Sequence, residues 1–152
     1  MRGLSLLAAC LILAASLAGC AASISEKNFS LSSNQVGFDK GGIASFNLTY
    51  DPRAMPADAT YTLDRKYAVE HVKFDREGSI MKEHETDDAR SLDLRFYLDG
   101  EEVETFVFDG DRRTIEVRLK VPEGLATGNY RLRLTLFQVG AVESNVFRVA
   151  DP

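Results

Sequence analysis

The chain has 152 residues, of which 23 are acidic and 18 are basic, and its formal net charge is −5. Such an acidic surface argues against binding to nucleic acid and against adhesion to anionic lipid headgroups, so neither partner is expected. The sequence has no internal repeat and no low-complexity tract, and its length suits one domain with a real core better than two.

The N-terminal segment 1–19 has the three parts of a secretory signal peptide. Arg2 gives a basic start, an uncharged apolar run extends from Leu4 to Leu17, and small residues follow. This run is shorter than the roughly 20 apolar residues that a membrane-spanning helix needs. We therefore expect a helical signal peptide that is removed. One alternative is a permanent anchor helix, because no charge follows Arg2 before Ser25. The other alternative is an ordinary cleaved signal peptide that leaves no lipid attached to the mature chain.

The end of this segment, Leu17-Ala18-Gly19-Cys20, resembles the lipobox of bacterial lipoproteins. The resemblance implies that the Cys20 thiol receives a diacylglycerol, that the leader is cut just before it, and that the new N-terminus is acylated. Because stable anchoring takes more than one acyl chain, two or three chains would hold the protein on a membrane without a spanning helix. In lipoproteins of bacteria with two membranes, an Asp directly after the modified Cys tends to retain the protein in the inner membrane. This chain has Ala21 at that position, so the resemblance implies that the protein is in the outer membrane, in a host that has one.

The rest of the chain is predicted to form one tethered domain. Cys10 would leave with the leader, so no disulfide can form within a monomer. Residues 20–27 form the lipidated N-terminus and a short tether, and residues 28–152 form the domain. At about 3.3–3.6 Å per residue, the segment from Ala21 to Lys27 reaches roughly 25 Å, which places the domain close to the bilayer.

Alternation of apolar and polar residues predicts strands with one buried face. The clearest alternating segments are 45–50, 92–98, 115–121 and 130–136, and a less regular last strand follows at 142–149. Asp99-Gly100 predicts a two-residue hairpin turn, because both central residues need a positive φ. The segment 51–58 contains two prolines and is predicted to be a loop.

The alternation changes phase between Tyr67 and Phe74. Tyr67 and Val69 share one parity, whereas Val72 and Phe74 share the other. A β-bulge near Glu70-His71 would reconcile the two halves, and so would two separate short strands.

Seven or eight short strands with frequent turns predict a single all-β antiparallel sandwich. The segment Gly124 to Leu132 resembles the entry to the penultimate strand of immunoglobulin-like and fibronectin type III-like domains. The resemblance implies that the Tyr130 hydroxyl folds back onto the preceding corner and that Leu125 plugs the end of the core, with Gly128 in the same motif. The chain lacks the core Trp and disulfide of antibody-type domains, so a transthyretin-like or other sandwich stays open.

Two groups of side chains offer metal ligands. His71 and His84 flank a predicted hairpin that turns at 76–79, and imidazole pairs suit copper or zinc. The acidic residues of 83–88, and Asp109-Gly110-Asp111, supply carboxylates of the kind that hold calcium. We expect both groups to be solvated polar turns and no metal to be bound, with metal binding as the alternative.

Catalytic groups are scarce in this sequence. Cys20 is blocked if it is acylated, no serine lies in a nucleophile-elbow context, and no pair of carboxylates stands out. We expect no enzymatic activity and no cofactor. The aromatic residues that could mark a binding face are Tyr97, Phe106, Phe108 and Phe137, and a bulge that returns Phe106 and Phe108 to the core is the alternative.

Taken together, these features predict an envelope lipoprotein that faces the periplasm and acts as a non-enzymatic interaction or assembly module. Its expected partners are membrane lipid, through acylated Cys20, and a protein of the cell envelope. The alternative function is binding of a metal or small ligand through the hairpin that carries His71 and His84.

Overall fold

The structure is a computed structural model. It describes residues 25–51, 59–81, 92–108, 114–136 and 139–152, without the side chains of 59–66 and 106–108. Predictions for the leader, Cys20, His84, Asp109-Gly110-Asp111 and Phe137 fall outside the described residues and stay predictions. In the part of the chain that the structure describes, no helix is long and apolar enough to cross a membrane.

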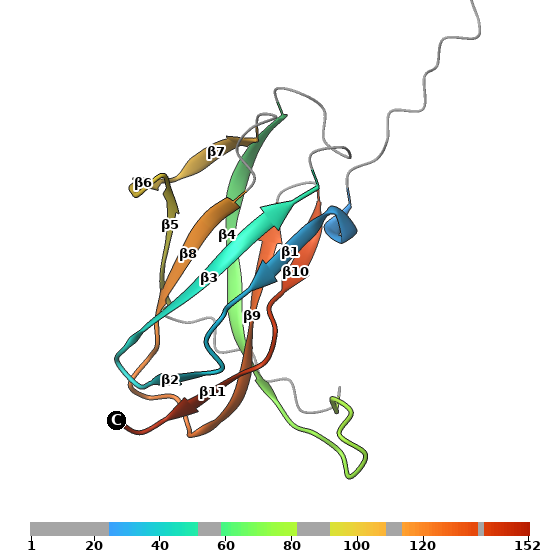
Figure 1. The fold of residues 1–152 in the computed structure, drawn as a ribbon, viewed down its shortest axis with the longest axis vertical. Coiled ribbons are helices and arrows are strands. Elements are labelled where there is room, and N and C mark those ends of the chain that lie inside the picture. Colours follow the sequence, from blue (N-terminus) through green and yellow to red (C-terminus); the bar gives the residue numbers. More distant parts are fainter. Residues whose placement is uncertain (1–24, 52–58, 82–91, 109–113, 137–138) are drawn as a thin grey trace, which may run out of the picture.

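Two β-sheets pack face to face, as Figure 1 shows. Sheet A has the order β1 (Phe29–Ser32), β3 (Ile43–Tyr50), β8 (Thr114–Lys120), β5 (Asp93–Leu98) and β6 (Glu101–Val103). Sheet B has the order β2 (Gly37–Asp39), β11 (Phe147–Ala150), β9 (Gly128–Leu136), β4 (Ala59–Val72) and β7 (Thr105–Phe108), and β10 (Gly140–Glu143) pairs with β9. A short 3₁₀ helix, η1 (Glu26–Asn28), precedes β1.

The strand order is that of an immunoglobulin-like sandwich. In sheet A, β1, β3, β8 and β5 follow the order A-B-E-D, and in sheet B, β11, β9 and β4 follow the order G-F-C. The chain crosses from one sheet to the other between its first two strands. Strand β1 pairs with β3 in sheet A, whereas β2 pairs in parallel with β11 in sheet B. All other strand pairs are antiparallel. The predicted all-β sandwich is therefore confirmed.

The predicted alternation places one face of each central strand in a common core. The most deeply buried large side chains are Phe46, Phe147, Leu48, Ile115, Leu119, Leu132 and Leu136. The rings of Phe38, Phe46 and Phe147 meet with centroids 5.4 to 6.0 Å apart. Full burial of one such side chain stabilises a fold by about 1.5–3 kcal/mol, so this core holds the two sheets together.

The corner before β9 has the geometry that the immunoglobulin-like resemblance implies. The Tyr130 hydroxyl donates to the Ala126 carbonyl at 2.7 Å, and Leu125 is buried in the core. A Cβ atom at Gly128 would lie only 2.8 Å from Nε2 of His71, whose ring stacks on Tyr130 with centroids 5.0 Å apart. Any other residue at position 128 would therefore require the His71 ring to move.

Two hairpin turns agree with the sequence. Asp99 and Gly100 have φ values of 53° and 87° and join β5 to β6 directly, with Leu98 opposite Glu101. The hairpin predicted at 76–79 also forms, with Phe74 bridged to Ile80. Both local predictions are confirmed.

The described residues form eleven strands, more than the seven or eight predicted, and the segment 142–149 is two strands instead of one. The interruption lies at Ser144. Its amide donates to the Leu132 carbonyl at 2.8 Å, and its hydroxyl accepts from the Leu132 amide at 2.9 Å while donating to the Asn145 carbonyl at 2.7 Å. The hydroxyl thus takes the place of a ladder carbonyl, and the chain bends here between β10 and β11.

The β-bulge predicted at Glu70-His71 is wrong, and β4 is one strand. From Tyr67 to Val72 it pairs without interruption with β9, and the irregularity lies earlier, between Leu63 and Tyr67. The apparent change of phase arises because Glu70 and Val72, on the outer face of sheet B, are as deeply buried as Val69 in the core. A strand that is buried on both faces does not alternate in sequence.

Candidate interaction face

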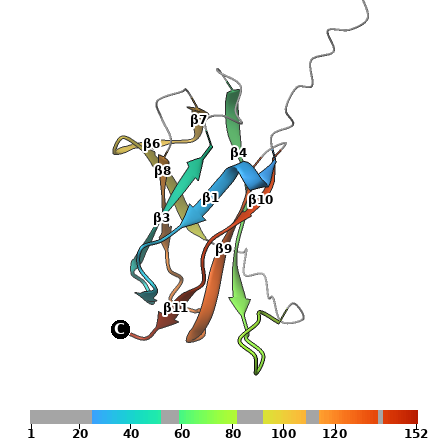
Figure 2. The same ribbon diagram turned by 45° about the vertical axis from the view of Figure 1, so that its right-hand side comes forward.

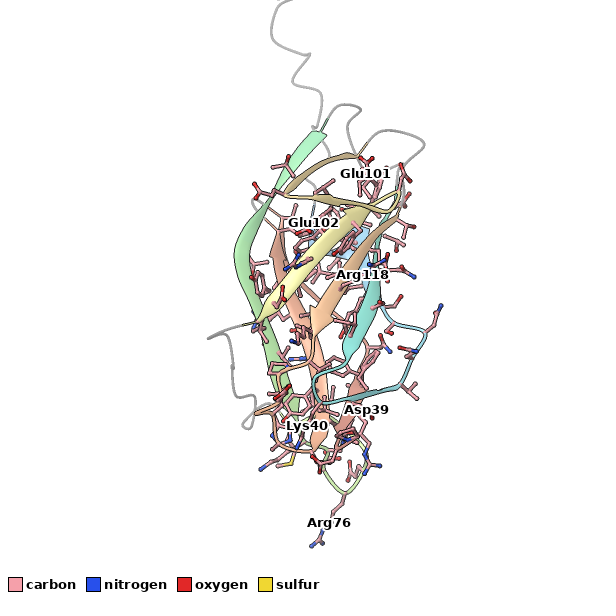
Figure 3. All side chains as sticks on the ribbon, turned by 90° about the vertical axis from the view of Figure 1, so that its left-hand side faces the viewer. Asp39, Lys40, Arg76, Glu101, Glu102 and Arg118 are labelled. Carbon is pink, nitrogen blue, oxygen red and sulfur yellow. The ribbon has the colours of Figure 1, made fainter. Side chains whose placement is uncertain are left out.

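The outer face of sheet A carries a shallow, open depression of about 590 Å³. We call it the sheet-A face; its lining residues are Gln35, Ile43, Ser45, Asp93, Arg95, Tyr97, Glu116, Arg118 and Lys120. All but Gln35 come from β3, β5 and β8, at the positions that the alternation predicts to point outward. Figure 3 looks onto this face, with Arg118 on β8 and Glu102 beside β5.

Arg118 lies at the centre of the sheet-A face. Its Nε and Nη2 donate to the two carboxylate oxygens of Glu116 at 2.8 and 3.0 Å, and its guanidinium carbon lies 4.2 Å from the centre of the Tyr97 ring. The register places Tyr97 opposite Glu116, so Arg118 reaches the ring as its diagonal neighbour. The hydrogen bond from Arg118 lowers the pKa of the Glu116 carboxyl, and the same bond raises the pKa of Arg118.

A second arginine extends this arrangement along β5. Arg95 donates to Asp93 at 3.0 Å and to Glu102 of β6 at 3.3 Å. The hydrogen bond to Asp93 is the main reason why the pKa of Arg95 is raised. Arg95 lies directly opposite Arg118 in the ladder. Two like charges in that position would repel each other, and the carboxylate partners offset the repulsion.

The sheet-A face is therefore a set of exposed but ordered hydrogen-bonding groups. The side chains of Arg95 and Arg118 are 52% and 42% exposed, yet each is held by a carboxylate. The exposed side chain of Ile43 adds apolar surface beside them. Such a face can donate and accept hydrogen bonds over a broad area, which suits recognition of a large partner better than enclosure of a small one.

The outer face of sheet B holds a different ion cluster, which we call the sheet-B cluster. Glu70, only 3% exposed, accepts from Nε of Arg131 at 2.7 Å and from Nη1 of Arg133 at 3.0 Å. Arg131 also contacts Glu143 at 2.9 Å. Burial by itself raises the pKa of Glu70, but the hydrogen bonds from the two arginines outweigh burial and lower the pKa below its ordinary value.

Of the two histidines considered as candidate metal ligands, one lies in the described part of the structure. His71 is half-buried, stacked on Tyr130 and close to Gly128, and His84 lies outside the described residues. The hairpin places Phe74 opposite Ile80. Among the described residues, no group of three or more His, Cys, Asp or Glu side chains is placed to hold a metal ion.

The sequence identified Tyr97, Glu116 and Arg118 as outward-facing residues but not as one group. Their contacts depend on the register between β5 and β8, which local alternation does not determine. Phe106 and Phe108 belong to β7, and their side chains lie outside the described part. The sheet-B cluster was missed altogether, because a buried carboxylate looks like a solvated one in sequence.

No family model and no curated protein matches this chain. Solved structures do resemble it. The chain is similar to part of a ceramidase complexed with C2, with a TM-score of 0.41 and 10% identity, over 82% of this chain and 19% of the ceramidase. It is similar to part of a family 123 glycoside hydrolase from Clostridium perfringens, with a TM-score of 0.34 and 7% identity, over 76% of this chain and 23% of the hydrolase.

A third similar structure is the third ScaB cohesin of R. flavefaciens in complex with a group 1 dockerin. The TM-score is 0.35 and the identity 10%, over 82% of this chain and 96% of the cohesin. The chain thus spans less than a quarter of the two hydrolases but nearly the whole cohesin.

Proposed function

We propose that this protein is a lipid-anchored module of the bacterial cell envelope that binds another protein through the sheet-A face and performs no catalysis. In this proposal acylated Cys20 holds the domain on the periplasmic side of a membrane, which is the outer membrane where the host has one. The lipobox resemblance at 17–20 supports the anchor. The geometry around Arg118 supports the binding role.

The observation that carries the binding role is the ordered contact of Arg118 with Tyr97 and Glu116 on an open face. Tyr and Arg, together with Trp, are the residues enriched among those that dominate protein–protein binding. Ordering of a long side chain on association costs about 0.5–1.5 kcal/mol. Glu116 already orders Arg118 in the unbound domain, so a partner meets a prearranged surface.

Co-purification from detergent-solubilised envelope tests this role. The full-length protein with a C-terminal affinity tag is compared with Tyr97→Ala, Arg118→Ala and a matched control, Arg148→Ala. Arg148 is exposed on β11, in the opposite sheet. We expect a stoichiometric protein partner with the unchanged protein and with the control. Since truncation of a dominant residue costs about 2 kcal/mol or more, recovery should fall at least about tenfold with the two sheet-A variants.

Either of two results would contradict the proposal. One is the absence of any stoichiometric partner of the unchanged protein. The other is equal recovery of the partner with all three variants. Circular dichroism of each purified variant establishes that it is folded, so that a loss of binding is not a loss of structure.

A further inference from the structure

The end of β4 continues beyond sheet B as a separate hairpin, residues Lys73–Met81, which we call the distal hairpin. Pairing of β4 with β9 ends where Val72 lies opposite Asn129. Figures 1 and 2 both show the distal hairpin extending past the end of the two sheets, and Figure 3 shows Arg76 projecting from its tip.

Internal hydrogen bonds hold the distal hairpin in one conformation. The Met81 amide donates to the Lys73 carbonyl at 2.8 Å, and the Asp75 amide donates to the Ser79 carbonyl at 2.8 Å. The Asp75 carboxylate accepts from the amides of Glu77 and Ser79 at 2.9 and 2.8 Å. Gly78 supplies the positive φ of 83° that the turn requires. The tip therefore needs little ordering when it binds.

The distal hairpin also exposes apolar surface. Phe74 and Ile80 are bridge partners and are 43% and 37% exposed. They are two of the four exposed large apolar side chains among the described residues; the others are Val36 and Ile43. Directly opposite residues of an antiparallel pair share one face, so Phe74 and Ile80 form one patch. Lys73, Arg76, Asp75 and Glu77 balance in charge, which leaves the apolar pair as the feature that a partner would recognise.

The distal hairpin and helix η1 lie at opposite ends of the domain (Figures 1 and 2). Helix η1 contacts β10, where Glu26 lies against Gly140, and Gly140 pairs with Leu136 at the last residue of β9. The distal hairpin begins beside Asn129, at the other end of the same strand. From Asn129 to Leu136 the strand rises about 23 Å at about 3.3 Å per residue.

We infer that the distal hairpin is a second docking element, which inserts Phe74 and Ile80 into an apolar socket of a protein partner. The inference rests on the proposed anchoring through Cys20. With the anchor on the η1 side, the apolar pair points away from the supporting bilayer, which favours a protein over that membrane. The patch protrudes and is small, so the partner must supply the concave surface, and the hairpin is one part of a larger contact.

Photo-crosslinking of the full-length lipoprotein in its own cells tests this inference. A photoreactive amino acid replaces Arg76 at the tip, either alone, together with Phe74→Ser and Ile80→Ser, or together with Val36→Ser. Val36 is the matched control, because it is an equally apolar and still more exposed residue away from the hairpin. We expect an adduct with a different protein, reduced at least tenfold by the Phe74→Ser/Ile80→Ser pair and unchanged by Val36→Ser.

Four results would overturn the inference: no adduct, an adduct with twice the mass of this chain, an adduct that survives loss of Phe74 and Ile80, or flotation of the purified protein with phospholipid vesicles that depends on these two residues. The second would indicate self-association, and the fourth would indicate membrane contact. The outcome is separable from that of the proposed function. Recovery of the partner with Tyr97→Ala tests the sheet-A face and does not depend on the adduct at position 76. The mass of the mature N-terminus tests the anchor and does not depend on either binding measurement.

Discussion

The outer faces of the two sheets carry the same chemical pair, arginine with carboxylate, in opposite environments. In the sheet-A face the Arg118–Glu116 pair is 42% and 34% exposed, whereas in the sheet-B cluster Arg131 and Glu70 are 13% and 3% exposed. Exposed pairs contribute about 0–1 kcal/mol to stability. Removal of one member of a buried pair leaves the other charge buried without compensation. The resulting loss of stability is several times larger than the contribution of an exposed pair. The sheet-B cluster therefore belongs to the fold, and the sheet-A face is ordered without being needed for folding.

The largest expected effect comes from the buried carboxylate. Glu70→Ala leaves Arg133 without this partner and deprives Arg131 of one of its two carboxylates. We expect the free energy of unfolding to fall by about 3 kcal/mol, the lower end of what breaking a buried pair costs. Urea denaturation measures this loss. Glu116→Ala is the matched control, for which we expect the free energy of unfolding to fall by less than about 1 kcal/mol. Equal losses for the two variants would remove the distinction between the faces.

Acid should weaken the sheet-B cluster in a predictable direction. The pKa of Glu70 is lowered in the folded protein from its ordinary value of 4.5. Its unfolded form therefore binds a proton more readily than its folded form, so the stability it contributes is complete above pH 4.5 and is lost as the pH falls through the folded pKa. The advantage of the unchanged protein over Glu70→Gln in urea denaturation should shrink from pH 7 to pH 3. A difference that stays constant over that range would contradict the assigned role of Glu70.

Arg118→Ala tests the other side of the comparison. The exposed pair with Glu116 contributes little, so we expect the free energy of unfolding to stay close to that of the unchanged protein while partner recovery falls. Thermal denaturation of the purified variant measures the first quantity. A loss as large as that of Glu70→Ala would mean that the sheet-A face is part of the structural framework.

Cys20→Ser should have the smallest effect on stability and should leave both faces intact. We expect a protein that leaves the membrane fraction but unfolds at the same urea concentration as the acylated form, since acylation is predicted to act only on attachment. Mass spectrometry of the mature N-terminus of the unchanged protein tests the lipid itself. An unmodified Cys20 or an intact leader would contradict the proposed anchor. An unfolded Cys20→Ser protein would contradict the proposal that the anchor and the domain have separate roles.

The alternation in sequence was enough to predict the core of this fold but not the relations between distant strands. Phe46, Leu119 and Leu132 are buried as the two-residue period requires, because each central strand has one face in the core. The contact of Arg118 with Tyr97 depends on the register of β8 against β5, which only tertiary packing fixes. Glu70 was missed because sequence does not reveal burial of a charge; the one local signal was the change of phase around it, which was misinterpreted as a bulge.

Photo-crosslinking at two matched positions, one on each outer face, tests the central claim most directly. A photoreactive amino acid replaces Ile43, an exposed residue of the sheet-A face, or Arg148 in sheet B, in the full-length protein in its own cells. Tyr97 and Arg118 stay unchanged. We predict an adduct with a stoichiometric protein partner from position 43 and no adduct of that mass from position 148. An adduct from position 148 alone, or from neither position, would contradict the assignment of recognition to the sheet-A face.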